Sequence, residues 1–249
     1  MLPCANFGRT SELKIPLMIL SSIRERFAPN PGWVHNAPEC RMHVHADLPD
    51  RHIDYAICHE VQALDCYRVR ELVAAGFSPR IIVDIGAHIG SFTALAGKYF
   101  PEAQIYSFEP LRDHYRFLVR NSPKRRVRPL NLAVLGFYGS EEGRDVYPGN
   151  EFERAYRSRQ LSNAISVRQL FSKYKLPRID LLKIDCEQSE VNIFRELDHL
   201  DRLKDIAVIT GEWHYETAKN EVRSIVGKTH EVELVDEGMW NHFFAKRRT

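Results

Sequence analysis

The sequence has few cysteines, and none of them stands at the C-x-x-C spacing typical of zinc ribbons and redox sites. Their odd number also argues against a complete disulfide framework. The five cysteines are Cys4, Cys40, Cys58, Cys66 and Cys186. We therefore expect the protein to work in a reducing, cytoplasmic environment.

Long hydrophobic runs and a strong net charge are missing as well. The apolar run at residues 15–20 is far too short to cross a bilayer, and no convincing cleavage site follows it. We expect neither an anchor nor a signal peptide, and no membrane partner. The net charge of +2 is too small to indicate a nucleic-acid partner, although residues 124–128 and 246–248 are basic. Such runs usually mark hydrated surface, so the charge pattern does not indicate the function. The sequence motifs do.

One stretch of the chain reads as strand, glycine turn, helix and second strand. Residues 81–85 fit a buried parallel strand, and Gly86 and Gly90 let the backbone approach a ligand where the next helix begins. The second apolar strand, residues 104–108, leads to Glu109, whose carboxylate can accept hydrogen bonds from ribose hydroxyls. The pattern predicts a site for an adenosine-bearing cofactor.

The spacing of the glycines favours S-adenosylmethionine over a dinucleotide. A dinucleotide fingerprint has a glycine where His88 stands in Gly86-Ala87-His88-Ile89-Gly90, and an imidazole there would obstruct a pyrophosphate. Asp84 is placed to organise the turn and to face an amine-bearing ligand. An NAD-dependent dehydrogenase is the alternative with different chemistry. The predicted cofactor-binding residues are Asp84, Gly86, Ala87, His88, Gly90, Glu109, Asn131 and Asp185.

Strand and helix patterns alternate from residue 81 onward, which predicts a doubly wound, mostly parallel α/β sheet. Strands are expected at 81–85, 104–108, 127–134, 179–185 and 206–209. Helices are expected at 91–99, 112–121, 167–174 and 189–197. Further segments are assigned to an antiparallel edge pair (230–235 and 242–246), two short N-terminal strands (43–45 and 51–57) and a helix (60–75).

We divide the chain into an N-terminal extension that covers the pocket, residues 1–54, and a cofactor domain, residues 55–249. Residues 136–162 are rich in glycine and charge, and are too long for a bare connection. We expect them to form a hairpin or a loop that contacts the substrate. Both segments are expected to set the choice of acceptor, because specificity often resides in loops above a rigid scaffold.

Polar residues gather where the predicted strands end. Ligands of open α/β sheets bind beyond the carboxyl ends of the strands, so we expect these side chains to surround one ligand. The residues are Asp84, Glu109, Asn131, Asp185, Glu187, Glu212 and His214.

The motifs resemble those of the FkbM-type methyltransferases. The resemblance rests on residues 83–90, 108–110 and 179–187 and covers about residues 55–246. It implies a class I, Rossmann-like methyltransferase fold, S-adenosylmethionine as donor, and commonly O-methylation of a hydroxyl on a sugar or secondary metabolite. The chain departs from the family pattern at Gln188-Ser189, where a glycine and a small residue are usual. This difference bears on the shape of the substrate pocket more than on the cofactor.

The resemblance also implies roles for individual residues. Asp84, Gly86 and Gly90 match the first cofactor motif, and Glu109 matches the acid that binds the ribose. Asp185 and Glu187 match the motif at the end of the fourth strand.

Methyl transfer to a hydroxyl benefits from a general base, and His214 is our candidate because an imidazole titrates near neutral pH. Glu212 would orient His214 or bind the acceptor, and Asp185 and Glu187 complete the predicted catalytic group. The alternative is that His214 simply caps a strand end or packs in its loop. The same four residues offer a second possibility, ligation of Mg²⁺ that binds an acceptor diol.

The predicted partner is a small hydroxylated molecule. Enzymes that methylate nitrogen often carry an Asp/Asn-Pro-Pro-aromatic motif after the fourth strand, whereas residues 185–188 read Asp-Cys-Glu-Gln. An RNA or N-directed methyltransferase is therefore a weaker alternative. A non-catalytic module that binds S-adenosylmethionine is another, since a fold alone does not establish turnover.

Overall fold

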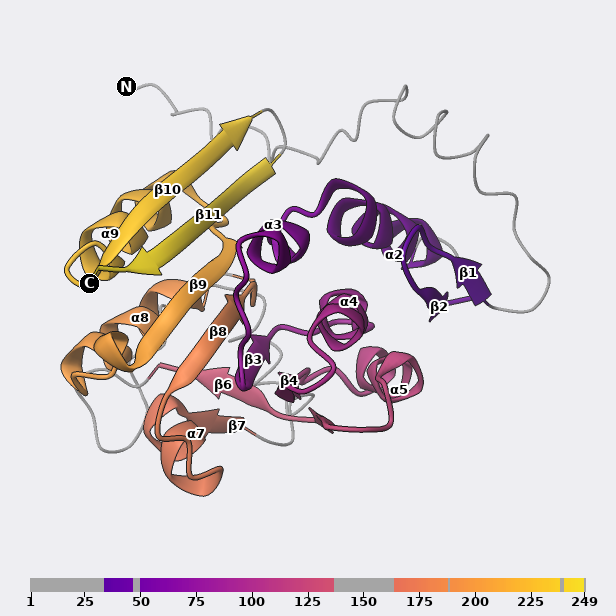
Figure 1. The fold of residues 1–249 in the computed structure, drawn as a ribbon, viewed down its shortest axis with the longest axis horizontal. Helices are drawn as coiled ribbons and strands as arrows, with labels where there is room; N and C mark the ends of the chain where they lie inside the picture. The colour runs from indigo at the N-terminus through magenta and orange to yellow at the C-terminus, as the bar shows by residue number, and fades with distance from the viewer. Residues whose placement is uncertain (1–33, 47–49, 137–163, 188, 238–239, 249) are drawn as a thin grey trace, which may run out of the picture.

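A seven-stranded sheet forms the centre of the computed structural model, in the order β10-β11-β9-β8-β3-β4-β5 (Figure 1). The structure describes residues 34–46, 50–136, 164–187, 189–237 and 240–248. The sheet strands are β3 (Ile81–Ile85), β4 (Gln104–Phe108), β5 (Val127–Leu130), β8 (Ile179–Ile184), β9 (Ile206–Glu212), β10 (His230–Glu237) and β11 (Trp240–Arg247).

The five strands from β9 to β5 pair in parallel, whereas β11 runs antiparallel to both of its neighbours, β9 and β10. The predicted α/β class and the antiparallel edge pair are therefore confirmed. Two further pairs lie outside this sheet. They are the antiparallel strands β1 (Val34–Asn36) and β2 (Arg41–His43), and the parallel strands β6 (Ala133–Leu135) and β7 (Ala164–Ser166).

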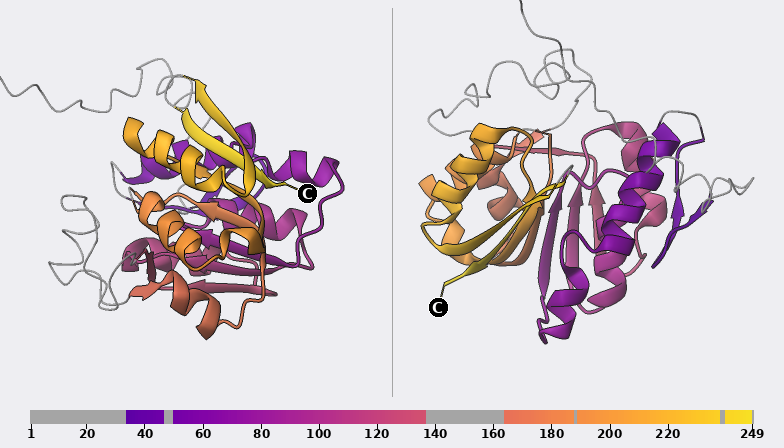
Figure 2. Two further views of the ribbon diagram at one scale, coloured as in Figure 1. Left: turned by 90° about the vertical axis from the view of Figure 1, so that its left-hand side faces the viewer. Right: turned by 90° about the horizontal axis from the view of Figure 1, so that it is seen from above.

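Helices cover both faces of the sheet (Figure 2). Because side chains alternate along a strand, Val83 and Ile85 pack in one apolar cluster and Ile82 in the other. The first cluster includes α7 (Val167–Lys173), α8 (Glu190–His199), the 3₁₀ helix η2 (Leu203–Asp205) and α9 (Glu216–Val226). The second includes the π-helix η1 (His59–Leu64), α3 (Val69–Ala74) and α4 (Ser91–Tyr99).

The N-terminal strands and helix α2 (Asp50–Cys58) form a third layer outside α4. Met42, Tyr55 and Cys58 pack there against Ile89 and Ala94. Asn121, at the end of α5 (Arg112–Asn121), fastens the layer: its Nδ2 donates to the carbonyl of His43 at 2.8 Å, and its Oδ1 accepts from the His43 N–H at 2.6 Å. The predicted boundary between residues 54 and 55 falls inside α2, and the division stays a prediction.

Two assignments near the N-terminus are wrong. Residues 51–57 belong to helix α2 rather than to a strand, because the buried residues Asp54, Tyr55 and Cys58 recur at helical spacing. The other short strand lies at Arg41–His43, not at 43–45.

The helix expected over residues 60–75 is broken into η1 and α3. Asp65 and Arg68 between them have positive φ angles of 57° and 58°. The carboxylate of Asp65 accepts the N–H groups of Val69 and Arg70, both at 2.9 Å, and so starts a new helix.

Residues 127–134, expected as one strand, divide at Asn131 into β5 and β6, which lie in different sheets. Helix α9 has no counterpart among the predicted elements. The predicted loop 136–162 lies outside the described residues except for Gly136. Among the described helices, none combines the length and the apolar character that crossing a membrane requires.

Candidate active site

The glycine turn after β3 lies between the ends of β4 and β8. The N–H groups of Gly86 and Ala87 donate to the carbonyl of Phe108 at 3.0 and 2.9 Å. Gly86 has a φ of 78°, and a Cβ there would lie 1.7 Å from the carbonyl oxygen of Asp185. Gly90, with a φ of 90°, ends the turn where α4 begins. A small apolar hollow, lined by Ile85, Phe108, Val134 and their neighbours, lies beside it.

Glu109 follows β4 and is only 4% exposed. Its two carboxylate oxygens accept the backbone N–H groups of His88 and Leu111, both at 2.8 Å. Burial raises the pKa of Glu109 to about 7 despite these two donors. Asn131 donates to the carbonyls of Glu109 and Pro110, both at 2.9 Å, so it holds the loop that carries the acid. A carboxylate has about four acceptor positions, so Glu109 keeps capacity for ribose hydroxyls.

The contact of His88 with Glu109 is made by its backbone N–H. Its ring lies against His114, with centroids 4.1 Å apart, and its Nε2 is 3.8 Å from Asp54. Burial, together with the neighbouring His114 and His45, lowers the pKa of His88 to about 3, so the imidazole is neutral. No pattern in the sequence pointed to this cluster, since its members come from segments far apart in the chain.

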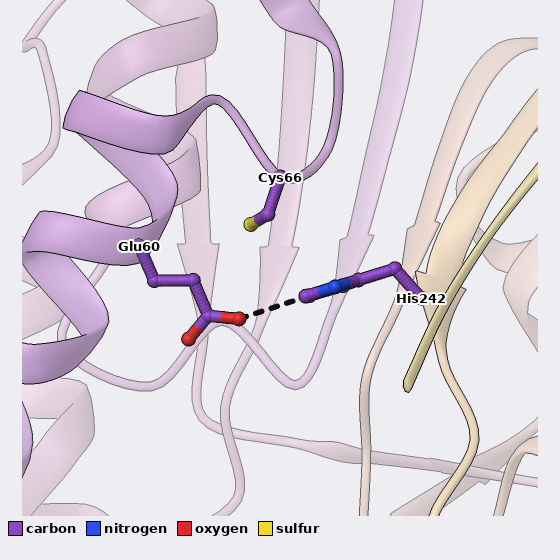
Figure 3. A group of neighbouring side chains, drawn as sticks. All are labelled: Glu60, Cys66 and His242. Carbon is purple, nitrogen blue, oxygen red and sulfur yellow. Dashed lines mark ion pairs between the residues drawn. The ribbon is translucent and has the colours of Figure 1, made fainter. Parts of the chain in front are cut away.

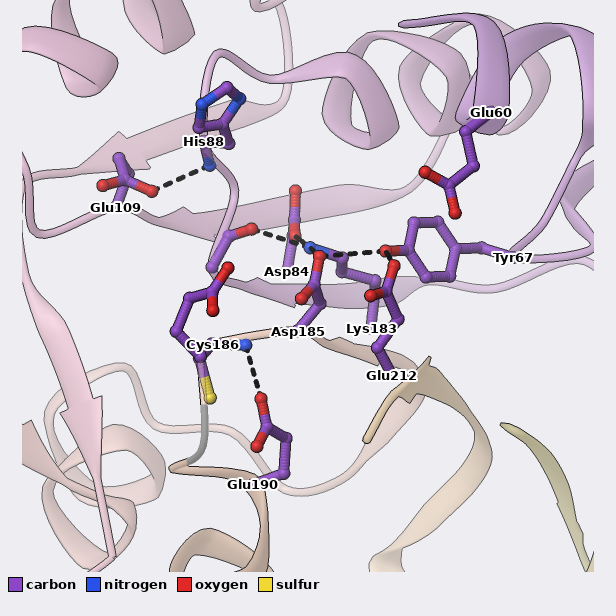
Figure 4. A network of polar contacts seen from close by, with 12 residues as sticks. Glu60, Tyr67, Asp84, His88, Glu109, Lys183, Asp185, Cys186, Glu190 and Glu212 are labelled. Carbon is purple, nitrogen blue, oxygen red and sulfur yellow. Dashed lines mark hydrogen bonds and ion pairs between the residues drawn. The ribbon is translucent and has the colours of Figure 1, made fainter. Parts of the chain in front are cut away.

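Lys183 is the central cation of the site (Figure 4). Its Nζ donates to the carbonyl of Gly86 at 2.7 Å, and lies 3.5 Å from Asp84 and 3.4 Å from Asp185. Burial lowers the pKa of Lys183, but Asp185 and Asp84 outweigh burial and raise it. Asp84 also accepts from the hydroxyl of Thr93 at 2.6 Å. Asp84 is thus linked to the turn through a lysine on the neighbouring strand.

Tyr67 joins two of the predicted catalytic acids. Its hydroxyl lies 3.0 Å from Asp185 Oδ2 and 3.0 Å from Glu212 Oε1, so one proton faces two carboxylates (Figure 4). Burial would raise the pKa of Asp185, but Lys183 and His214 lower it. Sequence reasoning missed Tyr67, because it comes from the loop before α3, more than a hundred residues from its partners.

His214 sits among three carboxylates. Its Nδ1 is 3.2 Å from Glu190, and its Nε2 is 3.6 Å from both Asp185 and Glu187. Burial lowers the pKa of His214, but the carboxylates, first of all Glu190, raise it to about 10. At neutral pH the ring is therefore an imidazolium. Glu190, fully buried at the start of α8, was not among the predicted site residues.

The structure brings the four predicted catalytic residues together. Asp185, Glu212 and His214 each offer a ligand atom within 4.8 Å of the others, and Glu187 contacts His214 from its exposed position after β8. Lys183 and the imidazolium already place two positive charges beside these three carboxylates. The predicted Mg²⁺ gains no support from these contacts and stays a prediction.

The strand order, the glycine turn after the first parallel strand and the acid after the second define a class I, Rossmann-like methyltransferase. A family model described as the methyltransferase FkbM domain matches residues 84–233, and the chain belongs to this family. The protein is thus an S-adenosylmethionine-dependent methyltransferase.

Individual relatives are distant. Methyltransferase sdnD of Sordaria araneosa is 27% identical over 196 residues, which cover 63% of this chain and 74% of sdnD. A putative O-methyltransferase from Klebsiella pneumoniae is similar with a TM-score of 0.44 at 15% identity, over 77% of this chain and 83% of that one. Monomeric WbdD matches with a TM-score of 0.38 at 11% identity, over 81% of this chain and 42% of WbdD. The family assignment rests on the match to the family model.

Proposed function

We propose that the protein transfers the methyl group of S-adenosylmethionine to a hydroxyl of a small molecule such as a sugar or secondary metabolite. The observation that carries the proposal is the group of hydrogen-bonding side chains beside the glycine turn. It contains the acids Asp185, Glu187 and Glu212 together with His214. Carboxylates and an imidazolium suit a hydroxyl, which both donates and accepts hydrogen bonds.

The residues around the turn fit the cofactor. Glu109 is buried and already oriented by two N–H groups. Asp84 Oδ1 is buried, lies 3.5 Å from Lys183 Nζ and accepts no hydrogen bond from the described residues. Bound there, S-adenosylmethionine supplies an activated methyl group. The residues that would hold it are Asp84, Gly86, Ala87, His88 through its backbone, Gly90, Glu109 and Asp185, with Asn131 behind them.

The chain's own residues would align the acceptor and remove its proton. Alignment alone can supply about 7–11 kcal/mol of the barrier. For His214 to act as general base, its proton must first pass to a carboxylate, and Glu187 stands 3.6 Å from its Nε2. The Glu187 side chain is exposed, so a proton that reaches it can pass on to solvent. Glu212 and Asp185 would then hold the acceptor hydroxyl.

The first test is calorimetric titration with S-adenosylhomocysteine, NAD and NADP, with and without EDTA. We expect selective binding of S-adenosylhomocysteine, unaffected by EDTA. Glu109→Gln should weaken it about 10- to 150-fold, because a hydrogen bond to a charged group contributes about 1.5–3 kcal/mol. Glu102→Gln is the matched control, since Glu102 is exposed just before the same strand. Selective NAD binding would overturn the proposal, and no binding at all would favour a non-catalytic domain.

The same titration has a predicted pH dependence. The pKa of Glu109 is about 7, and the ionised carboxylate is the better acceptor for ribose hydroxyls. Affinity for S-adenosylhomocysteine should therefore rise as the pH passes upward through about 7. In Glu109→Gln the rise should disappear. A profile that is flat in the unaltered protein would contradict the assignment of Glu109 to the ribose.

Turnover is tested by offering S-adenosylmethionine with hydroxylated, amine-bearing and RNA acceptors. We expect methylation of a hydroxyl, and we expect His214→Asn to lower kcat while leaving S-adenosylhomocysteine affinity unchanged. Removal of a general base typically costs about 10²- to 10⁴-fold in rate. Methylation of nitrogen or RNA alone would replace the proposal with its alternative.

A further inference from the structure

Glu60, Cys66 and His242 meet beside the candidate active site, although they come from three separate segments (Figure 3). Glu60 lies on the π-helix η1, Cys66 in the loop before α3, and His242 on the antiparallel strand β11. Each offers a ligand atom within 4.8 Å of the other two. Single π-helical turns occur often at functional sites, where they redirect one side chain.

Two carboxylates face the same ring nitrogen of His242 at this place. His242 Nε2 lies 3.0 Å from Glu60 Oε1 and 3.1 Å from Glu212 Oε1, so a single N–H faces two carboxylates. His242 is only 5% exposed, and Cys66 is a free thiol. A divalent cation would attract Glu60 and Glu212 at once, and so would balance the two carboxylates that face His242.

We propose that Glu60, Cys66 and His242 bind one Zn²⁺ ion. A carboxylate oxygen, a thiolate and an imidazole nitrogen form a ligand set typical of tetrahedral zinc, whereas Mg²⁺ and Ca²⁺ take oxygen ligands. On binding, the metal replaces the proton on Cys66 Sγ and the proton on His242 Nε2, and both protons pass to solvent.

The zinc site has a defined relation to the methyltransferase site. Three protein ligands leave a fourth position open. Glu212 Oε1 lies 3.1 Å from His242 Nε2, the nitrogen that would bind the ion, and it also accepts from Tyr67. The ion would therefore tie η1 to the C-terminal strand pair and replace the His242 proton that faces Glu212. It is a different site from the predicted Mg²⁺ group, and its existence does not depend on the acceptor.

The test loads the metal-free chain with Zn²⁺, and in parallel with Co²⁺. We expect one ion per chain, a thiolate-to-cobalt charge-transfer band, and a rise in the melting temperature with Zn²⁺. Cys66→Ser should abolish the band. Glu60→Gln and His242→Gln should each weaken Zn²⁺ binding by more than about 100-fold, because even outer partners of metal ligands contribute about 10- to 100-fold.

Cys40→Ser is the matched control, since Cys40 is also a free, half-buried thiol but lies outside the group. It should keep the band and the affinity. Circular dichroism shows whether each variant is folded. A metal-free chain that takes up no stoichiometric Zn²⁺, or a cobalt band that survives Cys66→Ser in a folded protein, would overturn the zinc site. Neither result bears on S-adenosylhomocysteine binding, which is measured separately.

Discussion

His214 is one imidazole among Glu190, Asp185 and Glu187, and its protonation should govern part of the stability of the fold. Its pKa rises from 6.5 to about 10 on folding. The stabilisation is therefore fully present below pH 6.5 and is lost as the pH rises through about 10. We expect the free energy of unfolding to fall over this window, and to fall less steeply in His214→Gln.

Urea unfolding at a series of pH values measures this difference. The control is His52→Gln, because His52 is exposed on α2 and far in sequence from the site. Its pH profile should match that of the unaltered protein. Equal slopes in His214→Gln and the unaltered protein would show that His214 is not held as an imidazolium.

The turn between β3 and α4 depends on the absence of a side chain at Gly86. Gly86 and Gly76 have similar φ angles of 78° and 75°, but only Gly86 is crowded. A Cβ at Gly86 would lie 1.7 Å from a backbone oxygen, whereas nothing lies within 4 Å of a Cβ at Gly76. Gly76→Ala should lower the free energy of unfolding by about 1–2 kcal/mol, which is the strain of a left-handed residue other than glycine.

Gly86→Ala should lower the free energy of unfolding by about 2–5 kcal/mol, since overpacking adds about 1–3 kcal/mol to the same strain. Urea unfolding of both variants checks the comparison. If the two variants lose similar amounts of unfolding free energy, β8 can move away from the turn. The close approach would then not be needed for the fold.

In the apolar cluster on one face of the sheet, α8 packs on the strands through Phe194. This residue is fully buried, and its ring lies 5.9 Å from that of Phe243 on β11. Phe194→Ala should lower the free energy of unfolding by about 3–5 kcal/mol. For a chain of this size, each kcal/mol lowers the melting temperature by roughly 2–4 °C.

Far-ultraviolet circular dichroism and the fluorescence of the buried Trp213 should report the same transition if the core unfolds as one unit. Val119→Ala is the control, since Val119 is 46% exposed on α5, and a surface change there should stay within about 0.5 kcal/mol. A melting temperature for Phe194→Ala equal to that of the control would contradict the proposed packing.

Several elements were predictable because their signals are local. The helices at 91–99 and 112–121 and the strands at 81–85 and 104–108 have the bounds that periodicity indicated. Helix α2 was misassigned because alternation over a few residues also occurs on an amphipathic helix, and the packing of Tyr55 and Cys58 decided between them. The break at residue 65 depends on a side-chain cap that a pattern of apolar residues does not contain.

The sequence alone established the strand-turn-helix motif with its acids, because residues 81–109 are contiguous and their spacing reflects local geometry. The folded chain decided which groups join them. Tyr67 and His242 reach the site from remote segments, and topology sets that proximity. The folded chain also decided charge: burial among carboxylates makes His214 an imidazolium, whereas burial beside other imidazoles keeps His88 neutral. Residue type fixes an ordinary pKa, but only the tertiary environment supplies the fields that shift it.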